Sequence, residues 1–149
     1  MRILIDTNVI MDALLGRQPF FAASDTVLKI CHEENAEGFL AAHSVTNLFY
    51  MLRKFFKDEE LRDILRNLLD FLEVEQIDKE KVSLALKNNA FADFEDGLQY
   101  ECAKSVKADS IITRNKKDFT GSTIPVVTPM EFLATFPSEA GEDICEGKE

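Results

Sequence analysis

The stretch RILIDTNVIMDALL, residues 2–15, joins a short apolar run, an aspartate and a helix-like segment. The run RILI predicts a buried strand, and Asp6 follows it directly. Apolar residues then recur at helical spacing from Val9 to Leu14, which predicts a helix. In open α/β sheets, ligands bind beyond the carboxyl ends of the strands, so Asp6 is a candidate functional residue.

Strands and helices alternate along the rest of the chain. Further strands are predicted in GFLAAH (38–43), VEQI (74–77), SIITR (110–114) and PVVT (125–128), each separated from the next by a helical pattern or a turn. This alternation predicts a mostly parallel sheet of four to five strands with helices on both faces.

Capping residues mark several predicted helix starts. Ser44 is the predicted N-cap of the helix in VTNLFYMLRKFF (45–56), and Asp58 is the predicted N-cap of the next helix. Thr128 and Glu131 have the spacing of a capping box at the start of the last helix. The leucine stripe of the helix after Asp58 predicts packing in the core or at a subunit interface.

The length of 149 residues and a hydrophobic content of 46% predict one folded domain. We expect this domain to span residues 1–136 and an acidic, disordered tail to span residues 137–149. The opening residues resemble neither a signal peptide nor a membrane span, so we expect a cytoplasmic protein with no membrane partner.

Cysteine and histidine usage restricts the chemistry. Cys31, Cys102 and Cys145 are far apart, and the two histidines have no metal-ligand spacing, which argues against a zinc site or a disulfide framework. His43 is the only plausible base, and no nucleophile stands near it, so we expect it to be a boundary residue without a catalytic role. Any bound metal is therefore expected to have oxygen ligands.

The net charge is −10, and the predicted tail contributes −4 of it through five acidic residues and one lysine. This balance argues against a surface built for broad contact with phosphate backbones. Basic residues nevertheless cluster in two stretches, Arg53, Lys54 and Lys57 in one and Lys104, Lys107, Arg114, Lys116 and Lys117 in the other. Such clusters are usually solvated faces, with contact to substrate as the alternative.

Acidic side chains are expected to meet at the carboxyl edge of the sheet. Asp6 ends the first strand, Asp118 follows the fourth, and the segment ADFEDGLQY (92–100) brings Asp93 and Asp96 to the start of a helix. Carboxylates that share a crevice raise one another's pKa and oppose folding unless a cation offsets the repulsion. Mg²⁺ or Mn²⁺ suits such oxygen ligands, and phosphodiester hydrolysis with these ions needs no histidine.

Each of these polar residues also has a structural alternative. Asp93 is predicted to be the N-cap of its helix, and Asp96 would gain only about 0.3–1 kcal/mol from the helix dipole. Glu95 is out of phase with Asp96 and is expected to face solvent. Asn115 and Asp118 also suit a turn. We predict that Asp93 caps the helix and that Asp96 helps to bind metal.

Three stretches carry a family resemblance: LIDTNVIMDALL (4–15), DFEDGLQYECAKSVKADSIITRNKKDF (93–119) and IPVVTPMEFL (124–133). Together they resemble the PIN domain family of metal-dependent ribonucleases, which includes the VapC-like toxins of bacterial toxin–antitoxin pairs. The resemblance covers residues 1 to about 135. It implies a three-layer α/β/α fold with a central parallel sheet, usually a homodimer, and a cluster of acids that binds Mg²⁺ or Mn²⁺.

The resemblance also assigns residues. Asp6 matches the family's first acid, Asp96 matches the acid at the start of the later helix, and Asn8 and Asp93 match accessory polar positions.

Two positions depart from the family pattern. Asn47 stands where a glutamate is usual in the helix after the second strand, and Asn115 stands where an aspartate often follows the dipeptide TR. Amides add no negative charge, so we expect weaker metal binding and weakened activity, with Asp118 supplying a missing carboxylate.

The resulting hypothesis is a Mg²⁺- or Mn²⁺-dependent endoribonuclease with an RNA substrate and a small antitoxin partner. Asp6, Asp96 and Asp118 are the predicted catalytic residues, and with Asp93 they are the predicted metal ligands. Arg114, Lys116 and Lys117 are predicted to bind RNA, and Asp6→Asn is expected to abolish cleavage without unfolding the protein. The alternatives are a catalytically weakened PIN-like module that binds RNA or protein, and a haloacid-dehalogenase-like phosphatase, although Asn8 replaces the second aspartate of that class.

Overall fold

The computed structural model describes residues 1–137, and the predicted acidic tail beyond them, with Cys145, lies outside the described residues. The elements in chain order are β1 (Arg2–Ile5), α1 (Thr7–Leu15), α2 (Phe21–His32), β2 (Glu37–Ala41), α3 (Ala42–Leu52), α4 (Asp58–Leu69), β3 (Leu72–Glu75), α5 (Lys79–Lys87), α6 (Phe94–Ser105), β4 (Ser110–Ile112), the 3₁₀ helix η1 (Lys116–Phe119), β5 (Val126–Val127) and α7 (Pro129–Thr135). None of these helices is long and apolar enough to span a bilayer.

The strands form one sheet in the order β3-β2-β1-β4-β5, and every neighbouring pair is parallel. β1 lies in the middle, with Ile3 paired to Gly38 on one side and to Ser110 on the other. The chain runs outward from β1 to β3 and then returns to β4 on the opposite side. The carboxyl ends of β1 and β4 therefore flank a topological switch point, where open α/β sheets bind ligands.

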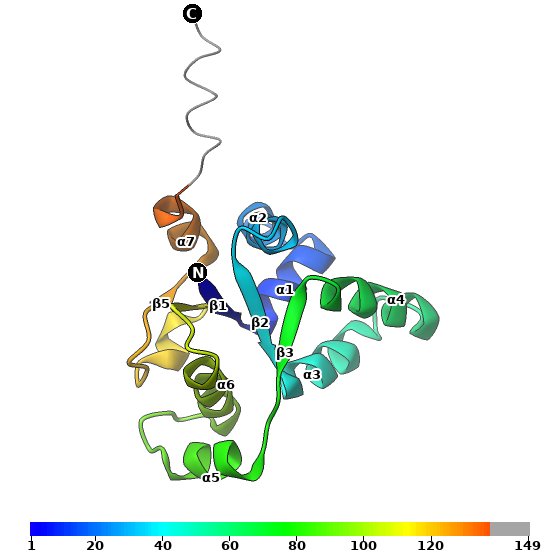
Figure 1. Cartoon of the computed structure of the whole chain (residues 1–149). Helices are drawn as coiled ribbons and strands as arrows, with labels where there is room; N and C mark the ends of the chain where they lie inside the picture. The colour runs from blue at the N-terminus through cyan, green and yellow to red at the C-terminus, as the bar shows by residue number, and fades with distance from the viewer. Residues whose placement is uncertain (138–149) are drawn as a thin grey trace, which may run out of the picture.

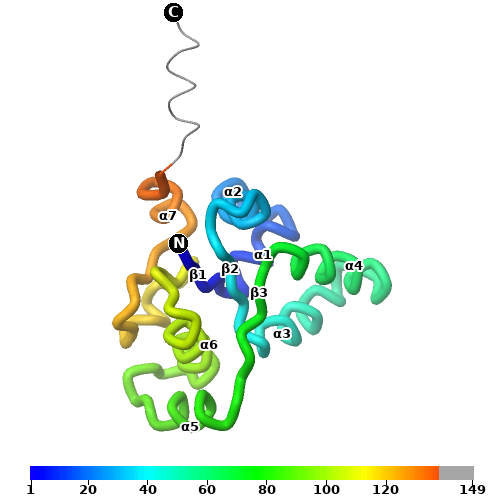
Figure 2. Tube along the Cα trace, viewed as in Figure 1, coloured from blue at the N-terminus to red at the C-terminus, as the bar shows by residue number. Residues whose placement is uncertain are grey.

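Helices cover both faces of the sheet in a three-layer α/β/α arrangement (Figure 1). Helices α1, α2, α3, α4 and α7 pack on one face over a core that includes Ile3, Ile10 and Leu48. Helix α6, with α5 packed against it, covers the other face over a core that includes Leu4 and Cys102. The last helix, α7, packs against α2, and Figure 2 shows it beside the start of β1.

Two of the predicted helix caps are wrong. β2 leads directly into α3, so the extended Ala41 is the N-cap, and Ser44 is fully buried within the helix. Helix α4 has Lys57 as its N-cap, and Asp58 instead pairs with Arg62 in the first turn. In both places the helix begins where the preceding segment ends. The prediction had instead placed the start at a residue type that is preferred as an N-cap.

Other local predictions are confirmed. Thr128 and Glu131 form the capping box of α7, and Asp93 is the N-cap of α6. The leucine stripe of α4 buries Leu61, Leu65 and Leu68 against the core. The third strand is β3 (Leu72–Glu75), two residues earlier than predicted, because Leu72 is buried in the core and the chain leaves the sheet after Glu75.

Candidate active site

An open cavity of about 520 Å³ lies at the switch point, beyond the carboxyl end of β1. Five carboxylates line it, and they come from three separate parts of the chain: Asp6, Asp93, Glu95, Asp96 and Asp118. The first follows β1, the next three open α6, and the last belongs to η1 after β4. The fold therefore gathers the four predicted metal ligands, and Glu95 with them, at one cavity.

Asp6 is held by donors on both carboxylate oxygens. Its Oδ1 accepts the backbone N–H of Thr7 at 2.7 Å and Nε2 of Gln99 at 2.9 Å. Its Oδ2 accepts Oγ1–H of Thr113 at 2.8 Å and Nδ2 of Asn8 at 3.1 Å. Asp6 is only 8% exposed. These four donors fix the orientation of Asp6 at the base of the cavity.

Gln99 and Thr113 were not recognised in the sequence as site residues. Gln99 lies one turn after Asp96 on the same face of α6, and it is 1% exposed. It lines the cavity, and its Oε1 has no hydrogen-bond partner. Thr113 is fully buried directly after β4. Gln99 could have been found from its one-turn spacing after Asp96 in the sequence. Thr113 is revealed only by the pairing of β1 with β4.

Asp96 carries the clearest electrostatic effect in the cavity. Burial, as the largest cause, together with the negative charges of the neighbouring acids Asp93, Asp6 and Asp118 raises its pKa from 3.8 to about 7. The neighbouring acids are therefore close enough to disfavour the ionised form. A bound cation would reverse this effect, because it stabilises the carboxylate.

Asp93 and Glu95 differ in their roles at the start of α6. Asp93 Oδ1 accepts the backbone N–H of Glu95 at 2.7 Å, as an N-cap does. Glu95 is exposed, as expected, but its side chain also contacts the cavity wall. Its Oε1 accepts Nδ2 of Asn47 at 2.6 Å and lies 3.7 Å from Nε2 of His43. Burial lowers the pKa of His43, against the opposing charges of Glu95 and Asp6.

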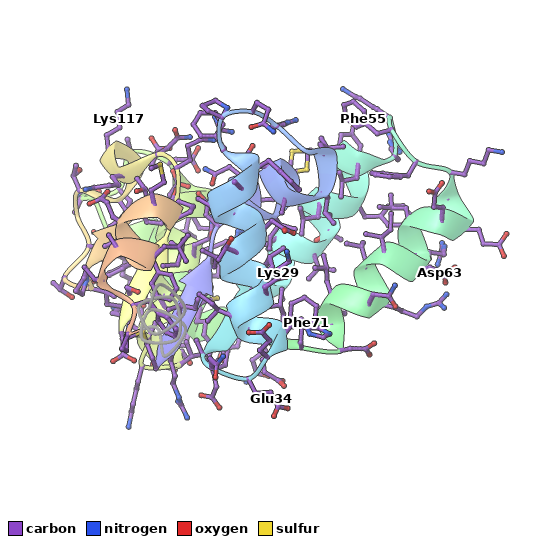
Figure 3. All side chains as sticks on the ribbon, turned by 90° about the horizontal axis from the view of Figure 1, so that it is seen from above. Lys29, Glu34, Phe55, Asp63, Phe71 and Lys117 are labelled. Carbon is purple, nitrogen blue, oxygen red and sulfur yellow. The ribbon has the colours of Figure 1, made fainter. Side chains whose placement is uncertain are left out.

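The predicted RNA-binding residues do not line this cavity. Arg114 Nε lies 2.9 Å from Oδ2 of Asp12, a carboxylate that is 1% exposed on α1. Its guanidinium also lies 4.3 Å from the ring centroid of Phe20. Lys116 pairs with Glu131 on α7 at 3.0 Å. Lys117 points away from the molecule in Figure 3. The contribution of these three side chains to RNA binding stays a prediction.

The family model described as "PIN domain" matches residues 2–117. The chain belongs to the PIN domain family. A related sequence, "Ribonuclease VapC1" of Aquifex aeolicus (strain VF5), is 29% identical over 135 residues, covering 88% of this chain and 92% of that protein.

Solved structures share this PIN fold. A toxin–antitoxin complex from Klebsiella pneumoniae contains a chain that matches with a TM-score of 0.65 and 21% identity, covering 85% of this chain and 97% of that one. VapBC2 from Rickettsia felis, bound to a DNA fragment from its promoter, matches with a TM-score of 0.63 and 16% identity over the same shares of the two chains.

The accessory asparagines of this PIN domain differ in position. Asn47 lines the cavity and donates a hydrogen bond to Glu95. The Glu95 carboxylate therefore lies beside the position where the family usually has a glutamate. Asn8 donates to Asp6, and its Oδ1 accepts the backbone N–H of Arg114 at 3.2 Å. Asn115 is the N-cap of η1, and its backbone N–H donates to Thr113.

The donor chemistry of the cavity fits Mg²⁺ or Mn²⁺. Carboxylate and amide oxygens are the ligands that these hard cations prefer, and the buried Oε1 of Gln99 adds an unpartnered acceptor in a side chain that lines the cavity. Within residues 1–137, however, no three His, Cys, Asp or Glu side chains are already arranged as a metal-binding group. The carboxylates are therefore gathered at one cavity without forming a finished coordination shell.

Proposed function

We propose that this PIN domain is a Mg²⁺- or Mn²⁺-dependent endoribonuclease and the toxin of a toxin–antitoxin pair. The observation that carries the proposal is the convergence of five carboxylates, of which Asp96 has its pKa raised to about 7. The similarity to the ribonuclease of Aquifex aeolicus supports cleavage of RNA. The shared fold with chains of toxin–antitoxin complexes supports a small antitoxin as partner.

Asp6, Asp96 and Asp118, with Asp93 at the cap of α6, would hold the metal. When bound, Mg²⁺ or Mn²⁺ would neutralise charge on the phosphoryl oxygens and favour deprotonation of the attacking water. The protein's own part is to fix the ligands. Thr113 and Gln99 orient the Asp6 carboxylate, and Asp96 releases its proton as the site takes up positive charge.

Glu95 is proposed to compensate for the missing acid on α3. Its carboxylate accepts a hydrogen bond from Asn47, the residue that stands at the family's usual glutamate position. The negative charge is therefore supplied from α6 to nearly the same wall of the cavity. We expect Glu95→Gln to weaken Mn²⁺ binding in titration calorimetry, whereas a charge restored by Asn47→Glu in that variant should recover it.

Cleavage of a single-stranded RNA with and without Mn²⁺ tests the function. The wild type is expected to cleave only with the metal, and Asp96→Asn and Asp118→Asn should each lose cleavage. Asp63→Asn on α4 is a matched control, because Asp63 is exposed, pairs with Arg66 and does not line the cavity. Cleavage that survives without metal, or in Asp96→Asn, would refute the assignment.

A weakened module that binds RNA or protein is the second candidate, and the amides at Asn47 and Asn115 favour it. Such a module should show no Mn²⁺ affinity that depends on Asp6, so calorimetry separates the two functions. The phosphatase alternative gains no support, because Asn8 donates a hydrogen bond to Asp6 where that class needs an acid. The proposed homodimer is testable by light scattering of the purified chain.

A further inference from the structure

Helix α3 has one face in the core and another face on the cavity. Ser44, Leu48 and Leu52, spaced by four residues, are fully buried. Asn47, Tyr50 and Met51 line the cavity from a neighbouring side of the helix. The cavity wall is therefore polar near the acids at Asn47 and becomes aromatic and apolar about one turn farther along the helix.

The far end of this wall is basic and aromatic. Tyr50 lines the cavity with 62% of its surface exposed, and the Arg53 guanidinium lies 4.1 Å from its ring centroid. Exposed Lys54 and Lys57 follow within one more turn of chain, with the exposed ring of Phe55 between them. We call residues 50–57 the basic–aromatic segment.

The cations of this segment have no carboxylate partner among the described residues, unlike other cations near the cavity. Within residues 1–137, Arg53, Lys54 and Lys57 take part in no ion pair. By contrast, Arg114 and Lys116 are held by carboxylates. Figure 3 shows Phe55 well apart from Lys117, on the side of the molecule that carries α3 and α4.

We propose that the basic–aromatic segment holds single-stranded RNA beside the cavity, an inference that rests on the proposed nuclease function. An unpaired base stacks on Tyr50, and Arg53 and Lys54 contact the phosphates next to it. Positively charged grooves with aromatic stacking platforms are the usual means of binding single strands. The five cavity carboxylates repel phosphate, so cations without carboxylate partners next to Tyr50 would help to bring the strand to the cavity.

Fluorescence anisotropy with a labelled single-stranded RNA tests this inference in the Asp96→Asn background, which prevents cleavage. Tyr50→Ala is expected to weaken binding about ten-fold without changing its salt dependence, and Tyr50→Phe should retain wild-type affinity. Arg53→Ala should reduce the slope of log affinity against log salt by about 0.7, because one phosphate contact is lost. Leu86→Ala and Arg66→Ala, exposed residues outside the cavity lining, are the matched controls.

Unchanged RNA affinity in Tyr50→Ala would overturn the inference. Equal affinity for duplex RNA would overturn it as well, because a paired base cannot stack on Tyr50. Cleavage assays of the otherwise wild-type chain keep the two proposals apart. RNA cleavage that is insensitive to Tyr50→Ala would leave the nuclease standing without this binding site, whereas Tyr50-dependent binding without any cleavage would leave the binding site without the nuclease.

Discussion

Replacing Asp96 by asparagine is expected to stabilise the metal-free protein while abolishing cleavage. Burial and the surrounding acids raise the Asp96 pKa from 3.8 to about 7, so ionisation of this residue opposes folding. Each unit of pKa shift corresponds to about 1.4 kcal/mol, so ionised Asp96 would destabilise the folded protein by about 4 kcal/mol above pH 7. Water enters the open cavity and screens the charges, so we expect Asp96→Asn to gain about 2 kcal/mol at most.

The sign of the effect depends on pH. Between about pH 4 and about pH 7 the folded protein holds a proton on Asp96 that the unfolded chain has lost, so the free energy of unfolding falls as pH rises. Asparagine does not titrate. The stability difference between the variant and the wild type should therefore be largest above pH 7 and vanish below about pH 4.

Urea unfolding in the presence of a chelator measures this difference. Circular dichroism is the suitable probe, because the chain has no tryptophan. Asp63→Asn serves as the control and should change stability by less than about 0.5 kcal/mol, as expected for an exposed residue. A variant that is no more stable than wild type at high pH, or whose advantage is the same at every pH, would contradict the assigned electrostatic strain.

Three further predictions concern the same site. Mn²⁺ should raise the melting temperature of the wild type, and calorimetry should show weaker binding as pH falls through about 7, because the metal competes with the Asp96 proton. Asp6→Asn should lower the free energy of unfolding by about 1–3 kcal/mol, because the NH₂ group of the new asparagine would face side chains and a backbone N–H that donate to Asp6 in the wild type. Urea unfolding measures this loss. Arg114→Met should cost about 3 kcal/mol in the same assay, because it leaves the buried Asp12 carboxylate without its main partner.

The sequence predicted those parts of the fold that follow from local patterns. The run before Asp6, the helix after it and the capping box at Thr128 are each contained within a few residues. The cap at Ser44 was wrong because β2 and α3 are joined without a loop, and a preference of one residue type cannot reveal such a junction. Tertiary packing decided where that helix begins.

The candidate site was harder to predict because its contacts join distant residues. Asp6 meets Gln99 and Thr113, which lie 93 and 107 positions away in the chain. The acids themselves were recognisable, since open α/β sheets bind ligands beyond the carboxyl ends of their strands, where Asp6 and Asp118 stand in the sequence. The solvent exposure of Glu95 was expected, but helical phase alone did not reveal that a side chain at a helix start can be exposed and still line the cavity beside Asp96.

The two walls of the cavity rest on opposite faces of the sheet. Helix α6, which carries Asp93, Asp96 and Gln99, packs over one face of the sheet, and α3, which carries Tyr50, packs over the other. Repacking beneath α3 would therefore shift Tyr50 while leaving the acids of α6 in register with Asp6. For the proposed ribonuclease, this arrangement would let RNA preference change over evolutionary time separately from the cleavage chemistry.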